Sequence, residues 1–317
     1  MSLQLSQKDR YRGSLLGLAI GDAVGTTVEF HAPGTFEPLK DLVGGGPFNL
    51  QAGQWTDDTS MALCLAESLL VCGKFHPVDQ MERYARWYRE GYLSSTGVCF
   101  DIGNTVRTAL DRFELTGEPF CGSLNRLASG NGSLMRLAPV PLYYAANPQE
   151  AIVKSGDSSL TTHGSILTVD ACRYYGALII GALQGASKEQ LLKESFSPVV
   201  GFWEKHYLVP EIDEIAKGSF KRLQPPDIKG SGFVVKSLEA ALWAFYHSCS
   251  FAEGCLLAAN LGDDADTTAA VYGQLAGAYY GVNDIPEHWL NKLYMKSFIE
   301  ETADSLLRAA EEVKRCG

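Results

Sequence analysis

The strongest constraint on the fold of this chain is a set of long segments that are apolar on almost every side. Residues 57 to 73 read DDTSMALCLAESLLVCG, and residues 164 to 183 read GSILTVDACRYYGALIIGAL. A helix that is apolar all round has to be buried among other helices. A third segment, residues 266 to 281, carries small residues that permit close helix contact. We therefore expect a core built from packed helices.

Helical periodicity also dominates much of the remaining chain. Further helices are predicted at residues 8 to 24, 76 to 91, 101 to 113 and 250 to 262, and in the last region, which Pro286 opens. The alternation that is typical of strands is scarce, and no strand-helix rhythm repeats. The sequence thus predicts an all-α fold in a single domain over residues 1 to 317.

Two segments interrupt this pattern. Residues 31 to 53 are rich in glycine and proline, and a loop of that length inside a compact domain is often functional. We expect it to gate a cleft. Residues 204 to 232 are charged and contain Pro225-Pro226. We interpret this second stretch as a surface excursion, because helical core patterns continue on both sides of it.

Composition limits the classes of partner. Charged residues make up 20% of the 317 residues, and the net charge is −10. This charge argues against nucleic acid and against an anionic membrane surface as partners. The eight cysteines form no C-x-x-C pair, which favours reduced thiols in a cytoplasmic protein. The basic residues before GSLLGLAIG suggest a signal peptide, but Asp22 ends that apolar run early.

Two clusters of acids and threonines adjoin the apolar helices. They lie about two hundred residues apart in the chain, and six of their oxygen-bearing side chains are candidate ligands: Thr56, Asp57, Asp58, Asp264, Asp266 and Thr267. Helix capping explains part of the pattern, because Asp and Thr accept hydrogen bonds from the free N–H groups at a helix start. A single cap uses one or two such side chains, however, and each cluster offers more.

The clusters have a second interpretation if the two helices pack side by side. Two carboxylates about 4 Å apart repel each other by roughly 4 kcal/mol at an effective dielectric near 20. Four converging aspartates would therefore need cations, and two divalent ions would neutralise them. Ligands that offer only oxygen favour Mg²⁺ first and Mn²⁺ second over zinc or copper.

At this point the motifs resemble those of a known family, the ADP-ribosylglycohydrolases. The resemblance rests on GLAIGDAVGTTVEF (17 to 30), GQWTDDTSMAL (53 to 63), GNGSLMRLAPVPL (130 to 142) and GDDADTTAAVYGQLAGAYYG (262 to 281). FDIGNTV (100 to 106) and TTHGS (161 to 165) add to it. The motifs stand in the family's order and span nearly the whole chain, and the ordered set is more specific than any one of them.

The resemblance implies a fold and a metal centre. It implies an all-α fold with two Mg²⁺ or Mn²⁺ ions in a central cleft, held by the six residues of the two clusters. Many family members have Gly-Gly-Asp-Thr-Asp-Thr at the second cluster, where this chain has Asp263 for a glycine and Ala265 for a threonine. Neither change removes a ligand, but Asp263 makes the site more acidic. We expect Asp263 to support the ligands or to cap the helix.

The resemblance also implies roles for individual residues. Glu29, Asp101 and Asp58 are the candidate catalytic carboxylates, and Asp22 has a structural role in supporting the loop. Seven residues are candidates for substrate binding: Asn104, Thr105, Asn131, Gly132, Ser133, Met135 and His163. The loop at 131 to 135 would hold ADP-ribose largely through backbone groups. Arg136 is either an internal ion-pair partner or a phosphate ligand, and His163 is either a ligand-binding residue or an ordinary core histidine.

The expected reaction is hydrolysis of the bond between ribose and a protein side chain or small acceptor. The two ions would orient the ribose hydroxyls, water would attack the anomeric carbon, and Glu29 or Asp101 would transfer the proton. Two alternatives stay open: a two-metal nucleotide phosphohydrolase, and a non-catalytic relative that binds ADP-ribose. The acceptor residue and the oligomeric state are not fixed by the sequence, although a monomer is favoured.

Overall fold

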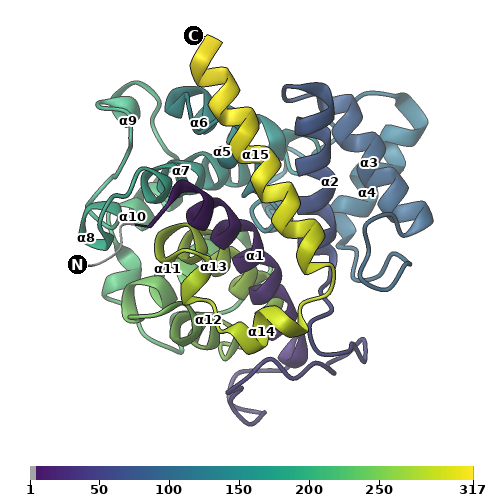
Figure 1. Cartoon of the computed structure of the whole chain (residues 1–317), viewed down its shortest axis with the longest axis vertical. Helices are drawn as coiled ribbons and strands as arrows, with labels where there is room; N and C mark the ends of the chain where they lie inside the picture. The colour runs from purple at the N-terminus through teal and green to yellow at the C-terminus, as the bar shows by residue number, and fades with distance from the viewer. Residues whose placement is uncertain (1–4, 317) are drawn as a thin grey trace.

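The computed structural model describes residues 5 to 316, with the side chains of residues 5 to 313, and every regular element in that range is helical (Figure 1). The α-helices are α1 (Gln7–Gly25), α2 (Asp57–Cys72), α3 (Pro77–Glu90), α4 (Asn104–Thr116), α5 (Pro139–Tyr143), α6 (Pro148–Leu160), α7 (Ile166–Leu183), α8 (Lys188–Leu191), α9 (Phe202–Lys205), α10 (Pro210–Ala216), α11 (Val234–His247), α12 (Phe251–Ala259), α13 (Ala265–Tyr280), α14 (Glu287–Lys292) and α15 (Lys296–Cys316). Short 3₁₀ helices are η1 (Thr26–Val28), η2 (Arg126–Ala128), η3 (Ser219–Lys221) and η4 (Val282–Asp284). The β pairings in the described part are isolated bridges, so the all-α prediction is confirmed.

The centre of the fold is the close antiparallel pairing of α1 and α13. Glycines recur every four residues along one side of α1. A Cβ atom added to Gly21 would overlap the Ala269 carbonyl oxygen, and one added to Gly17 would overlap the Gly273 carbonyl oxygen. The missing side chains let the two backbones touch. As a result the end of α1 lies directly beside the start of α13, where the second acidic cluster stands.

The other long helices enclose this pair. Helices α7 and α11 pack against α13, whereas α15 crosses both α1 and α2 on the face shown in Figure 1. Helix α7 is long and apolar enough to cross a membrane by length and composition, but 83% of it is buried inside the molecule. It is thus the core helix that its sequence predicts. Helix α2 is also buried along most of its length and ends at Gly73, whose φ is 65°.

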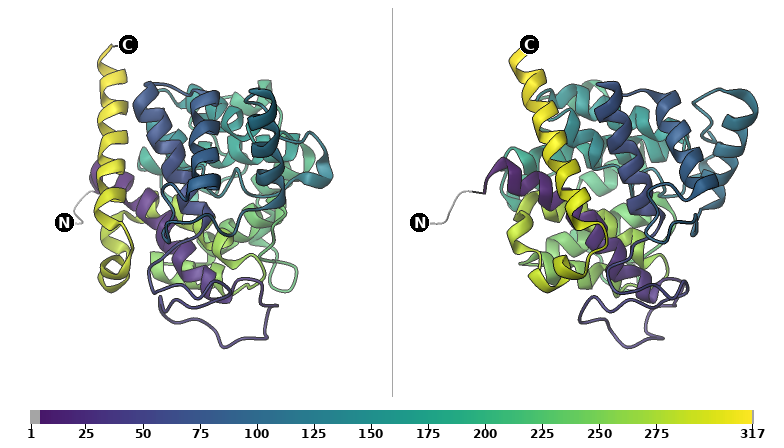
Figure 2. Two further views of the ribbon diagram at one scale, coloured as in Figure 1. Left: turned by 90° about the vertical axis from the view of Figure 1, so that its right-hand side faces the viewer. Right: turned by 45° about the vertical axis from the view of Figure 1, so that its right-hand side comes forward.

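The segment at 31 to 53 is irregular, as predicted, and extends beyond the end of α1 (Figure 2). Buried Leu42 and Leu50 anchor it to the core. The Asn260 side chain fixes its middle, because it accepts from the Leu39 N–H at 2.7 Å and donates to the Leu39 carbonyl at 3.1 Å. The ring of Phe48 contacts that of Phe100 at a centroid distance of 5.1 Å. The loop therefore reaches the segment that precedes α4.

Two local predictions were wrong. The stretch at 204 to 232 is not a simple surface excursion, because α10 and η3 bury Ile212, Ile215 and Phe220 in the main core. Charged residues between these apolar positions concealed their helical spacing. Helix α4 begins at Asn104 instead of residue 101, because Asp101 has a φ of 56°, outside the helical region.

Candidate metal centre and substrate cleft

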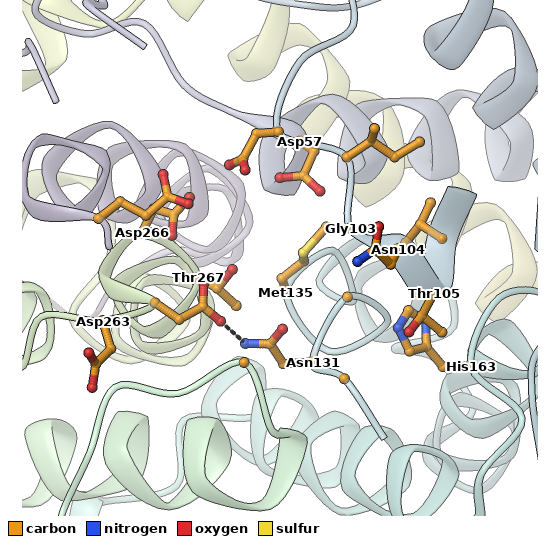
Figure 3. A pocket seen from close by; sticks show the side chains of 18 of the residues that line it. Asp57, Gly103, Asn104, Thr105, Asn131, Met135, His163, Asp263, Asp266 and Thr267 are labelled. Carbon is orange, nitrogen blue, oxygen red and sulfur yellow. Dashed lines mark hydrogen bonds between the residues drawn. The ribbon is translucent and has the colours of Figure 1, made fainter. Parts of the chain in front are cut away.

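A cleft of about 660 Å³ opens where several helix ends meet (Figure 3). Its size falls in the range of small-molecule sites. The walls come from the turn after α1, the start of α2, the segment before and into α4, the loop before α5, and the start of α13. Its lining residues are Glu29, Phe30, Asp57, Asp101, Ile102, Gly103, Asn104, Thr105, Val106, Gly130, Asn131, Gly132, Met135, His163, Gly232, Asp263, Asp264, Asp266 and Thr267.

Carboxylates converge at one end of this cleft. Asp22, Asp58 and Asp266 each offer an oxygen within 4.8 Å of the other two. Glu29 and Asp101 form a second such group with the same Asp266. The residues come from α1 and its following turn, from α2, from the segment before α4 and from α13. Asp58 of the first predicted cluster thus meets Asp266 of the second, and Asp266 links both groups, whereas Asp57 and Asp264 belong to neither group.

The acids are too buried and too close together to ionise independently. Asp58 and Asp266 are 0% and 1% exposed, and Glu29 is 2% exposed. Burial, followed by repulsion from neighbouring carboxylates, raises the pKa of all three groups, to about 10 for Glu29. The same two causes raise the pKa of Asp101 to about 8. A nearby cation would reverse these shifts.

Unpaired oxygens show what the cluster lacks. Three buried carboxylate oxygens have no hydrogen-bond partner among the described residues: Glu29 Oε2, Asp58 Oδ1 and Asp266 Oδ1. A buried polar atom without a partner costs free energy. These oxygens point to a bound cation, and a set made only of oxygens fits a hard divalent ion. The residues present therefore fit the metal centre that the sequence predicted.

Asp22 both builds the centre and belongs to it. Its carboxylate accepts from the Thr56 N–H at 2.8 Å, the Thr59 N–H at 3.0 Å and the Thr59 hydroxyl at 2.6 Å. It therefore caps the start of α2 from another helix, which agrees with the predicted structural role. Burial raises its pKa to about 6 in spite of these bonds. Its place among the candidate ligands was missed, although an acid inside an apolar helix was a visible signal.

Hydroxyl and amide groups orient the acids. Thr56 Oγ1 lies 3.2 Å from Asp266 Oδ2, and Thr267 Oγ1 lies 3.3 Å from Asp58 Oδ2, so each threonine reaches across to the other cluster. The Asn131 amide donates to Asp264 Oδ2 at 2.7 Å. The Asn131 side chain thus holds an acid of the second cluster, while its neighbours form the cleft wall (Figure 3).

Three residues at the acidic end have left-handed backbones. The φ angles are 63° for Phe30, 56° for Asp101 and 52° for Asp263. Such conformations are uncommon outside glycine and collect at functional sites. The Phe30 N–H donates to the Asp263 carbonyl at 2.7 Å, which ties the turn after α1 to the start of α13. Asp264 occupies the N-cap position of α13, so capping, one of the two roles expected for Asp263, is excluded, and support of the ligands stays a prediction.

Most predicted site residues line this cleft, and three do not. Thr56 and Asp58 lie behind its wall, fully buried within the acidic cluster. The Ser133 hydroxyl points into the core, where it bonds to Ser159 at 2.8 Å. Sequence reasoning did not single out six other lining residues, of which all but Gly232 lie within the quoted motifs: Phe30, Ile102, Gly103, Val106, Gly130 and Gly232. The exposed phenylalanine beside Glu29 was a usable signal, whereas Gly232 gave none.

Arg136 takes neither of its two expected roles. Its side chain is 1% exposed and does not line the cleft. None of the ion pairs found in the described part of the chain involves it, and its guanidinium instead donates to the hydroxyl of Thr162 at 2.7 Å. It also lies over the ring of Tyr84, 4.6 Å from the centroid.

Fold and site together define a class: an all-helical protein with a buried cluster of carboxylates, compatible with a metal site, at one end of a cleft of ligand size. The model of the ADP-ribosylglycohydrolase family matches residues 3 to 316. The chain belongs to the ADP-ribosylglycohydrolase family and is an enzyme that hydrolyses a glycosidic bond.

Individual relatives agree with this assignment. The chain is 42% identical to ADP-ribosylarginine hydrolase Tri1 of Serratia proteamaculans, over 96% of this chain and 80% of that protein. It is 32% identical to ADP-ribosyl-[dinitrogen reductase] glycohydrolase of Rhodospirillum rubrum, over 96% of this chain and 98% of that protein. A solved structure titled "ADP-ribosylglycohydrolase-related protein complex" matches with a TM-score of 0.84 and 43% identity, covering 96% of this chain and 99% of that chain.

Proposed function

We propose that this protein removes ADP-ribose from arginine side chains of modified proteins or from small ADP-ribosyl compounds. The observation that carries the proposal is the convergence of acids from four separate segments around unpaired buried oxygens at one end of a cleft of ligand size. The relatives named above as acting on ADP-ribosylarginine and on ADP-ribosylated dinitrogen reductase support the substrate class.

The proposed cofactor is a pair of divalent cations, Mg²⁺ first and Mn²⁺ second. Six residues would hold them: Thr56, Asp57, Asp58, Asp264, Asp266 and Thr267. Bound there, the ions would orient ribose hydroxyls and lower the pKa of water beside the anomeric carbon. Asp58 and Asp266 offer oxygens within 4.8 Å of each other and of Asp22, which supports an ion position between the two clusters.

We assign proton transfer in the reaction to the carboxylates that line the cleft. Glu29 and Asp101 line the cleft and lie in the same oxygen group, so both can reach a reacting atom there. One would take the proton of the attacking water as the bond between the anomeric carbon and the arginine nitrogen breaks, and would return that proton to the departing guanidine. The acidic surroundings would stabilise the positive charge that develops on the sugar. Asp58, which is fully buried, would contribute as a metal ligand, and its negative charge would help to stabilise the positive charge on the sugar.

Charge favours arginine over serine as the acceptor. Two divalent ions balance the four aspartates at positions 57, 58, 264 and 266. Glu29, Asp101 and Asp263 then leave further negative charge at the same end of the cleft. A guanidinium is a cation that this charge attracts, whereas a serine hydroxyl gains nothing from it.

The other end of the cleft would hold the ADP-ribose portion. Asn104, Thr105 and His163 line it together with Gly132 and Met135. Glycine permits backbone N–H groups to approach phosphate closely.

The seven cysteines whose side chains are described are all unpaired, which supports a reducing, cytoplasmic setting as part of the proposal.

A product assay tests the proposal. The protein is incubated with Mg²⁺ and with peptides carrying ADP-ribosyl-arginine or ADP-ribosyl-serine, and the products are separated. Release of free ADP-ribose, faster from arginine, is the expected result. AMP as the product would instead assign a nucleotide phosphohydrolase, and Mg²⁺-dependent binding of ADP-ribose without any product would assign a binding protein.

A further inference from the structure

A buried chain of hydrogen bonds leads from Arg136 to the cleft. The Arg136 guanidinium lies 2.7 Å from Thr162 Oγ1, and Thr162 Oγ1 lies 2.8 Å from Nδ1 of His163. The three residues are 1%, 0% and 2% exposed. His163 lines the cleft, whereas Arg136 lies behind it. The chain thus connects a buried charge to the ligand surface.

The chemistry of the first bond sets the direction of the second. A guanidinium only donates hydrogen bonds, so the Thr162 hydroxyl oxygen accepts from Arg136. Among the described residues this hydroxyl has one other partner, Nδ1 of His163. If Nδ1 carried the hydrogen, the hydroxyl hydrogen would have no acceptor in a fully buried place, which costs about 1–3 kcal/mol. The hydroxyl therefore donates to Nδ1, and the ring hydrogen is on Nε2.

The Nε2 edge of the ring is open toward the cleft. Nε2 has no hydrogen-bond partner in the part of the chain that the structure describes. A Cβ atom added to Gly132 would lie 3.2 Å from Nε2, and one added to Gly130 would lie 3.4 Å from it. Two glycines thus keep side chains away from this edge. Burial, and then the Arg136 charge, lowers the pKa of His163 to about 3, so the ring stays neutral.

We propose that Arg136 and Thr162 are positioning residues that lock His163 in the Nε2–H tautomer, and that Nε2–H donates to an oxygen of the bound ADP-ribose. The ligand contact rests on the proposed function, whereas the tautomer rests on the protein alone. Without the lock, the ring could present a bare nitrogen, which repels the oxygens of phosphate and ribose. The tautomer therefore determines whether this end of the cleft attracts or rejects its ligand.

Nitrogen NMR of the ¹⁵N-labelled histidine rings in the wild-type protein tests the tautomer directly. The His163 signals are assigned by their loss in His163→Gln. The expected spectrum shows a neutral ring with hydrogen on Nε2, and saturating ADP-ribose shifts the Nε2–H signal. A ring with hydrogen on Nδ1, a charged ring, or an Nε2–H signal that ADP-ribose leaves unchanged would contradict the proposal.

A matched pair of variants tests the lock. Thr162→Ser keeps the hydroxyl, whereas Thr162→Val keeps the shape without it. We expect the serine variant to match wild type in tautomer and in ADP-ribose affinity measured by calorimetry. The valine variant should lose the single tautomer and bind about fivefold more weakly, as for one neutral hydrogen bond. A valine variant that folds and keeps both properties would overturn the role of Thr162.

The two proposals fail in different ways. If wild-type protein with Mg²⁺ neither binds ADP-ribose nor releases it from peptides, the proposed function and the ligand contact both fall, while the NMR spectrum still decides the tautomer. If release is normal but the ring carries its hydrogen on Nδ1, the positioning role alone is wrong.

Discussion

The two ends of the cleft differ in how their buried charges are balanced. At the acidic end, buried carboxylates come together with three oxygens unpaired and with raised pKa values. At the other end, the buried Arg136 guanidinium donates to the neutral hydroxyl of Thr162 and is linked through it to His163 at the cleft. The difference shows that the acidic end carries charges and unpaired oxygens that a cation would balance, whereas the other end is held by hydrogen bonds within the protein.

The largest effect on activity is expected from a substitution of Asp266, which belongs to both oxygen groups at the acidic end. Asp266→Asn keeps the shape but removes a charged ligand. We expect release of ADP-ribose to fall by more than about a hundredfold, beyond the loss typical of residues that only surround a metal site. Initial rates at saturating Mg²⁺ measure this. Asp227→Asn, at an exposed position, is the control and should retain full activity.

The next effect concerns the helix pairing that brings the acids together. In Gly21→Ala the new Cβ overlaps the Ala269 carbonyl oxygen, and such overpacking typically costs about 1–3 kcal/mol. Activity should fall as well, because Asp22 follows directly. Urea unfolding measures the stability. Gly232→Ala, where the nearest atom to an added Cβ is Asp264 Oδ2 at an ordinary contact distance of 3.6 Å, should leave the unfolding midpoint nearly unchanged, and equal midpoints in both variants would refute the packing argument.

The pH dependence of stability separates the two ends further. The pKa of Asp101 is raised from 3.8 to about 8, so the folded protein binds more protons than the unfolded chain between these values. Stability without cations should therefore fall as the pH rises through this window. Thermal unfolding in chelator, compared with excess Mg²⁺, measures this. We expect Mg²⁺ to raise the Tm by several degrees at the upper end of the window and by less at the lower end.

A Tm in chelator that climbs steadily from pH 4 to pH 8 would contradict this view of the acids. His163 acts in the opposite direction, because its pKa is lowered from 6.5 to about 3. Its contribution is complete above pH 6.5 and is lost as the pH falls toward 3. The acids with raised pKa values outnumber this one histidine, so in chelator the Tm should fall as the pH rises.

The main helices and the acidic end of the cleft could be predicted from the sequence, because they depend on local sequence patterns. The apolar runs predicted α2, α7 and α13, and the acid-threonine clusters predicted their meeting. The chain of hydrogen bonds from Arg136 through Thr162 to His163 could not be predicted, because it depends on which hydroxyl faces a buried guanidinium. The left-handed conformation of Asp101 was also hidden, because it is imposed by packing against other segments and not by the residue type.

The smallest effect on activity is expected at Asp263, and it tests whether arginine is the residue from which ADP-ribose is removed. Asp263 is exposed at the mouth of the acidic end, so solvent screens its charge. We expect Asp263→Asn to lower kcat/KM for an ADP-ribosyl-arginine peptide about threefold, the scale of a screened charge pair, and to leave free ADP-ribose affinity unchanged. An equal loss for the arginine and serine peptides would count against recognition of the guanidinium by this residue.

The most direct test of the account is a titration of metal-free protein with Mg²⁺ or Mn²⁺, followed by calorimetry and by release of ADP-ribose in the same samples. We expect two ions to bind per chain and activity to rise with their occupancy, and Asp266→Asn to lose both. Full release of ADP-ribose by protein in excess chelator, or a titration with no binding, would contradict the claim that the converging acids work through bound cations.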